Sequence, residues 1–252
     1  PPSGYLEMVG QPVAFAAEIR EDHGLQDAVW VFTDFEGGEV EVPATVGGTG
    51  PEYAVDDSIV FDQQGIYQVR LRAEDQCGNV AQSDTVDGLP ANVIIYDSAG
   101  GLVTGGGTIW SPPGAFHPGL ADFADLEGRA NFGFVAKYKK GAMVPTGHTE
   151  FQFKTGALDF KSKTYEWLVV AGKRAKYKGA GTVNGEGEFR FMLTAVDGDL
   201  NGGDGLDRLR MKIWGRDSGT VIYDNQSGSG DSDDLSDATI LMGGNIMIHR
   251  GR

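Results

Sequence analysis

Short alternating runs of apolar and polar residues recur along the whole chain, whereas the longer spacing of an amphipathic helix is nearly absent. Successive side chains of a strand point to opposite faces, so an alternating run predicts a strand with one buried face. Gly, Asn, Asp and Pro separate the runs at intervals of about ten residues, as in β-sandwiches and barrels. The clearest runs lie at residues 13–19, 28–32, 67–73, 131–135, 150–154, 167–170, 189–193 and 209–214. The pattern predicts an all-β protein.

Glycine is abundant, at 39 of the 252 residues, which is about twice its ordinary share. Hairpin turns need positive φ angles, which glycine adopts without strain. We therefore expect turns at Asn184-Gly185, Asp197-Gly198 and Asn201-Gly202.

Charge is distributed unevenly along the chain. Residues 1–95 carry 17 acidic and 3 basic side chains, a net −14, whereas residues 96–252 carry 19 and 18. A charge difference of this size predicts two modules, with the boundary near residue 96. We expect the stretch from Asp87 through the apolar residues 93–96 to Gly101 to form the crossing between them.

Net charge, apolar runs and cysteine count exclude several classes of protein. The chain as a whole has a net charge of −15, which excludes nucleic acid as the expected partner because phosphate binding draws on Lys and Arg. The apolar runs fall short of the roughly 20 residues that span a bilayer, so we expect no membrane insertion. The lone Cys77 cannot form an internal disulfide. We expect it to pack as a small apolar residue near a turn, the alternative being a reactive or cross-linking thiol.

Two stretches in the first module carry a family resemblance. Residues 65–71 read Gly-Ile-Tyr-Gln-Val-Arg-Leu, and residues 75–79 read Asp-Gln-Cys-Gly-Asn. Together they resemble the closing hairpin of PKD and HYR-type immunoglobulin-like repeats of bacterial surface proteins. The resemblance implies an immunoglobulin-like β-sandwich over residues 1–95, with Tyr67 packed at a strand start and Asp75 and Gly78-Asn79 in the tight final turn. The second cysteine of HYR repeats is absent here.

The second module carries a more extended resemblance. Its segments at residues 103–112, 130–141, 144–153, 165–170, 197–207, 213–214 and 243–249 are similar to the post-COAP family of C-terminal domains on secreted bacterial proteins. This resemblance implies a larger antiparallel β-sandwich or barrel over residues 96–252. It also implies extracellular export and an accessory, non-catalytic role.

An acidic loop supplies the clearest candidate for a metal site. Carboxylate and amide oxygens recur at short intervals, and Ca²⁺ takes six to eight oxygen ligands from such loops. The first half of the loop is similar to an EF-hand loop, but Arg208 stands where the bidentate Glu belongs and strands flank it. We therefore expect a calcium site in a β-loop, the alternative being an exposed acidic hairpin loop. A second carboxylate cluster lies at residues 231–237 and is a weaker candidate. The expected ligands are Asp197, Asp199, Asn201, Asp204 and Asp207.

Catalytic motifs are missing from the sequence. The four histidines are far apart, and the chain contains neither a zinc pairing nor a nucleophile elbow nor a phosphate loop. We expect a protein that is not an enzyme. The four tryptophans raise the alternative of sugar stacking: Trp30, Trp167 and Trp214 lie in alternating strands and are expected in the core, whereas Trp110 is expected to be exposed.

Lysines recur two residues apart, so each pair points to one face of a strand. The pairs are Lys137 with Lys139, Lys161 with Lys163, and Lys176 with Lys178. We expect either an ordinary solvated face or a cationic face that docks the acidic first module of a neighbouring copy. A head-to-tail contact of this kind propagates into a filament or array.

These observations favour an extracellular structural or adhesive module of a bacterial surface or matrix protein, stabilised by calcium and assembling head-to-tail. The expected partners are other copies of the chain, neighbouring surface proteins or a polysaccharide. The alternative is a carbohydrate-binding accessory module of a larger secreted enzyme.

Overall fold

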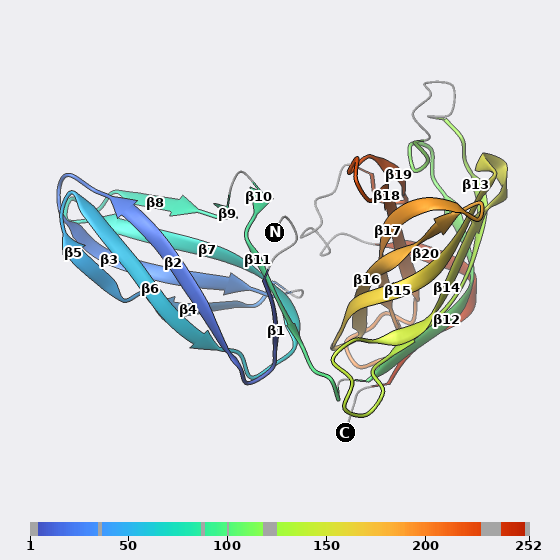
Figure 1. Ribbon diagram of the computed structural model, residues 1–252, viewed down its shortest axis with the longest axis horizontal. Helices are drawn as coiled ribbons and strands as arrows, with labels where there is room; N and C mark the ends of the chain where they lie inside the picture. The colour runs from blue at the N-terminus through green and yellow to red at the C-terminus, as the bar shows by residue number, and fades with distance from the viewer. Residues whose placement is uncertain are drawn as a thin grey trace. The chain divides into compact units, whose positions relative to one another are not determined.

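The computed structural model describes residues 5–34, 37–86, 89–99, 101–117, 125–227 and 238–249. Strands dominate these ranges, which also contain a 3₁₀ turn at Lys154–Gly156. The prediction of an all-β protein is confirmed. Contacts divide the chain into two compact units, Pro1–Tyr96 and Asp97–Arg252, and each is β-structured (Figure 1).

The first unit is an immunoglobulin-like β-sandwich, as expected. One sheet has the order β1 (Tyr5–Met8), β11 (Asn92–Tyr96), β7 (Gly65–Asp75), β3 (Leu25–Thr33), β4 (Glu39–Pro43), with β8 (Val80–Ser83) also paired to β7. The second sheet has the order β2 (Pro12–Arg20), β6 (Glu52–Val60), β5 (Val46–Thr49). A short separate pair is formed by β9 (Thr85–Val86) and β10 (Leu89–Pro90).

The core of the first unit joins its two sheets. Phe15 lies 5.5 Å from Trp30 between ring centroids, and Trp30 Nε1 donates a 2.7 Å hydrogen bond to the Asp57 carboxylate on the opposite sheet. Tyr67 packs its ring 4.9 Å from Phe61 and donates its hydroxyl to the Gln63 carbonyl at 3.0 Å. Buried and half-buried aromatic rings with satisfied polar tips therefore hold the sandwich together.

Within the expected crossing, residues 93–96 form strand β11 of the first unit, which ends where the two units divide. Strand β11 pairs antiparallel with β7 and parallel with β1. Val93 and Ile95 are buried in the sandwich core, whereas Ile94 and Tyr96 are buried on the other face of the strand. A strand that is buried on both faces is a continuous apolar run, so it lacks the alternation by which the other strands are predicted.

The second unit is a closed antiparallel barrel. Its strands are β12 (Leu102–Ser111), β13 (Gly128–Lys137), β14 (Thr146–Phe153), β15 (Leu158–Ala171), β16 (Arg174–Val183), β17 (Glu186–Val196), β18 (Arg208–Gly215), β19 (Val221–Asp224) and β20 (Thr239–His249). Strands β12 to β18 pair in sequence order, and β20 pairs with both β18 and β12, which completes the circuit. Strand β19 lies outside that circuit and pairs with β18.

Aromatic side chains fill the interior of this barrel. Phe134, Tyr165 and Phe191 surround Tyr177, with ring centroids 5.6 to 6.0 Å from its own. The Thr149 hydroxyl lies 2.9 Å from the hydroxyls of both Tyr165 and Tyr177. Burial raises the pKa of Tyr177 well above its ordinary value, so this interior network stays neutral.

Glycines serve both turns and close strand contacts. The expected turn at Asn184-Gly185 is present between β16 and β17, with φ angles of 54° and 83°. Where β12 crosses β20, a Cβ on Gly107 would lie 2.3 Å from the Gly243 carbonyl oxygen. Part of the glycine excess therefore allows neighbouring strands to approach.

Candidate functional site

The acidic loop at residues 197–207 connects β17 to β18, and two of its carboxylates bind backbone amides. Asp197 accepts hydrogen bonds from the amides of Ile248 at 2.9 Å and of Asp199 at 3.2 Å. Asp207 accepts from Ile246 at 2.7 Å and from Gly198 at 2.8 Å. These two carboxylates therefore come together along β20 and tie the loop to that strand.

The side chains of the other three expected calcium ligands have different surroundings. Asp204 forms an ion pair with Arg208, whose hydrogen bonds hold the pKa of that carboxyl well below its usual range. Asp199 and Asn201 are exposed. Calcium binding by the loop stays a prediction. The second expected cluster, at residues 231–237, lies outside the described residues.

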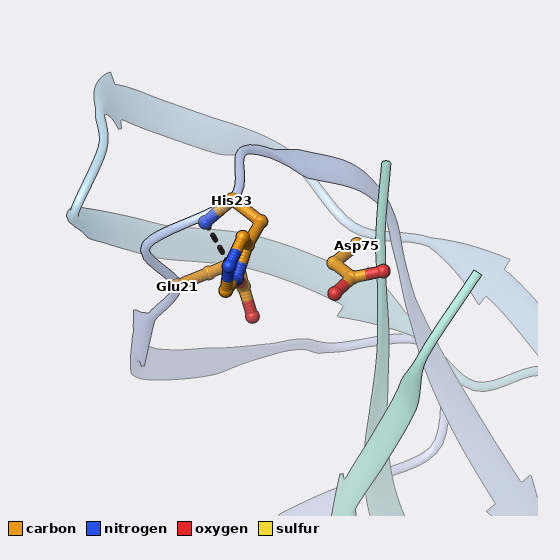
Figure 2. Close-up of side chains that lie close together, drawn as sticks. All are labelled: Glu21, His23 and Asp75. Atoms are coloured by element: carbon orange, nitrogen blue, oxygen red, sulfur yellow. Dashed lines mark hydrogen bonds and ion pairs between the residues drawn. The ribbon is translucent and has the colours of Figure 1, made fainter. Parts of the chain in front are cut away.

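A different group of side chains with possible metal-ligand atoms gathers in the first unit. Within the ranges that the structure describes, Glu21, His23 and Asp75 each offer one ligand atom, and these atoms all lie within 4.8 Å of one another. Figure 2 shows Glu21 and His23 side by side on the β2–β3 connection, with Asp75 across from them at the end of β7. His23 Nδ1 lies 3.3 Å from Glu21 Oε1.

Asp75 is buried and held firmly by the turn that follows it. Its Oδ1 accepts hydrogen bonds from the amides of Cys77 and Asn79, both at 2.8 Å, and its Oδ2 accepts one from Asn79 Nδ2 at 2.7 Å. Gly78 adopts a φ of 83° within the turn. The hydrogen bonds from Asn79, above all, hold the pKa of Asp75 below its ordinary value.

Sequence reasoning did not find this group. Glu21 and His23 are separated from Asp75 by more than fifty residues, and only strand pairing joins them. The register of β3 on β7 places Leu25 opposite Asp75, and the Gln76 amide donates to the Gly24 carbonyl at 2.9 Å. The one local signal is the spacing of Glu21 and His23, which is too common to identify a site.

Tryptophan exposure follows the expectations at three of four positions. Trp30 and Trp167 are buried, and Trp110 is 44% exposed. Trp214 lies instead on the outer face of the barrel, with the amino groups of Lys178 and Lys212 5.9 and 5.8 Å from its ring centroid. Its neighbours on β18 explain this placement, because the alternate residues of that strand fill the interior.

The expected cationic face is smaller than the sequence indicated. Lys176 is only 2% exposed, and the amino group of Lys178, also buried, lies 3.5 Å from a Glu166 carboxylate oxygen. Five exposed lysines lie instead along β13, the loop after it and β15, and they are Lys137, Lys139, Lys140, Lys161 and Lys163. We call these five residues the lysine cluster.

The expectation that Cys77 packs as an apolar residue is wrong, because the residue is exposed. It lies in the β7–β8 turn, where its amide donates a hydrogen bond to the Asp75 carboxylate.

Comparisons with known proteins bear on the first unit. Searching the curated proteins returned no match for this chain. Of the described residues, none forms a helix long and apolar enough to cross a membrane. The resemblance of residues 96–252 to post-COAP domains stays a prediction. Residues 3–87 match the family model described as PKD domain. That family is a non-catalytic immunoglobulin-like module typical of extracellular proteins, so the first unit is similar to an extracellular adhesive or structural module.

Proposed function

We propose that the chain is an extracellular structural module, without enzymatic activity, that associates head-to-tail with other copies of itself. The observation that carries the proposal is the opposite charge of the acidic first unit and of the lysine cluster on the barrel. Residues 1–95 have a net charge of −14. Exposed carboxylates occur on both of its sheets and its loops, including Glu18, Asp22, Asp27, Glu52, Asp56 and Asp62.

The lysine cluster lies on neighbouring strands of the barrel. Lys137 on β13 is opposite Thr146 on β14, and Lys161 on β15 is opposite Glu150, which is also on β14. Glu150 also lies 3.0 Å from His148 and 3.9 Å from Lys161. Glu150 is one carboxylate beside five lysines, so it compensates only part of the positive charge of the cluster.

A contact between the acidic surface of one copy and the lysine cluster of the next joins two different surfaces, so it is heterologous. Such a contact repeats from copy to copy and gives an open filament or array unless its rotation closes a ring. Complementary charges mainly accelerate and orient the association, and salt screens them over about 10 Å at 0.1 M ionic strength. The proposal therefore requires association that weakens as salt is added.

Charge reversal at the lysine cluster tests the contact. The variant Lys137→Glu with Lys163→Glu changes two exposed positions, at the end of β13 and within β15, and we expect it to remain monomeric where the wild-type chain associates. The matched control is Arg129→Glu with Lys154→Glu, two exposed positions at the opposite end of β13 and β14. Equal association of both variants would refute docking through the cluster.

A further inference from the structure

We propose that Glu21, His23 and Asp75 bind a divalent transition-metal ion of the Zn²⁺ type, which clips the β2–β3 connection to the β7–β8 turn. This inference is independent of the head-to-tail contact proposed above. It rests on the donor set, on the distances between donors and on the anchoring of both segments.

The donor set selects the class of ion. One imidazole nitrogen and two carboxylate oxygens suit Zn²⁺ and its first-row neighbours, whereas Ca²⁺ and Mg²⁺ prefer oxygen ligands alone. Three protein ligands leave a fourth tetrahedral position for water. The site differs in this respect from the oxygen-only calcium loop expected at residues 197–207.

The distances are close to those of a bound site. Ligand bonds of about 2.0–2.2 Å place neighbouring donors of a tetrahedral ion about 3.3–3.6 Å apart. His23 Nδ1 and Glu21 Oε1 already lie 3.3 Å apart, and Asp75 completes the group within 4.8 Å. His23 has a side chain that is 70% exposed, so a small rotation can close the remaining gap.

Both segments are anchored before any ion binds. The Glu21 amide donates to the Pro51 carbonyl at 2.8 Å, and the Gln76 amide donates to the Gly24 carbonyl at 2.9 Å. Asp75 accepts three hydrogen bonds from the turn, and a carboxylate has about four lone-pair sites, so one is left for a metal. Hydrogen bonds of this kind orient a ligating carboxylate.

Metal titration of the full chain tests the site. The background is Cys77→Ser, because an exposed thiol binds the same ions. We expect one equivalent of Co²⁺ to bind with visible absorption bands, Zn²⁺ to displace it, and Ca²⁺ to leave the spectrum unchanged. Zn²⁺ should also raise the melting temperature of the first unit.

Variants distinguish this site from nonspecific binding. In the same background, His23→Gln should weaken Zn²⁺ binding by about tenfold or more, whereas His249→Gln, at an exposed strand position in the barrel, should leave it unchanged. His23 is exposed, so its replacement keeps the fold, which circular dichroism would verify. Absence of saturable binding, or equal affinities of the two variants, would overturn the proposal.

Discussion

Removal of the Asp224 carboxylate should destabilise the barrel strongly. Asp224 and Arg210 form a buried ion pair whose side chains are 5% and 1% exposed. The two carboxylate oxygens of Asp224 accept hydrogen bonds from Arg210 Nε at 3.0 Å and Nη2 at 2.9 Å. Asp224 Oδ1 also accepts a hydrogen bond from the Gln226 amide at 3.0 Å. Breaking a buried pair on one side costs about 3–5 kcal/mol, because the remaining charge loses its compensation.

That cost converts into a measurable shift in melting temperature. For a unit of this size, each 1 kcal/mol lowers the melting temperature by about 2–4 °C, so Asp224→Ala should lower it by roughly 6–20 °C. The assay is thermal unfolding followed by circular dichroism and calorimetry, with the barrel transition assigned from its own variants.

An exposed ion pair on the same barrel supplies the control. Arg216 lies 2.6 Å from Glu188, and their side chains are 50% and 70% exposed. Glu188→Ala should cost less than about 1 kcal/mol, since water already screens this pair. Similar melting temperatures for Asp224→Ala and Glu188→Ala would refute the reasoning from burial.

Three further predictions concern the backbone, pH and calcium. Gly107→Ala should destabilise the barrel by about 1–3 kcal/mol in urea unfolding, because its Cβ would lie 2.3 Å from the Gly243 carbonyl oxygen; an unchanged midpoint would contradict this. The folded-state pKa of Asp75 is lowered, so its contribution to stability is present above its ordinary pKa and is lost as the pH falls through the lowered value. The free energies of unfolding of the wild type and of Asp75→Asn, measured between pH 6 and about pH 2, should therefore converge at the acidic end. If the loop at residues 197–207 binds calcium, chelator should lower the melting temperature of the wild type but not of Asp199→Ala with Asn201→Ala; no shift on chelation would remove calcium from the account.

Strand positions could be predicted because alternation is a local property of the sequence. The run at residues 67–73 lies within β7, and the run at residues 209–214 lies within β18. Closure of the barrel could not be predicted in this way. It depends on the pairing of β20 with both β12 and β18, and nothing local to those strands specifies their partners.

The candidate sites illustrate the same limit. The sequence marks Asp197 and Asp207 as functional candidates, but each also accepts a hydrogen bond from an amide of β20, about forty to fifty residues away. Glu21, His23 and Asp75 come together through the register of β3 on β7. Composition and spacing report which residue types are present, whereas strand register decides which of them meet.

Sedimentation velocity of the wild-type chain, at increasing protein concentration and at two salt concentrations, tests the proposed assembly most directly. At about 20 mM salt, where screening is weak, the account predicts species larger than a monomer that grow with concentration. At about 500 mM salt it predicts that these species dissociate. A single monomeric boundary at every concentration in low salt would contradict the account, as would association that salt leaves unchanged.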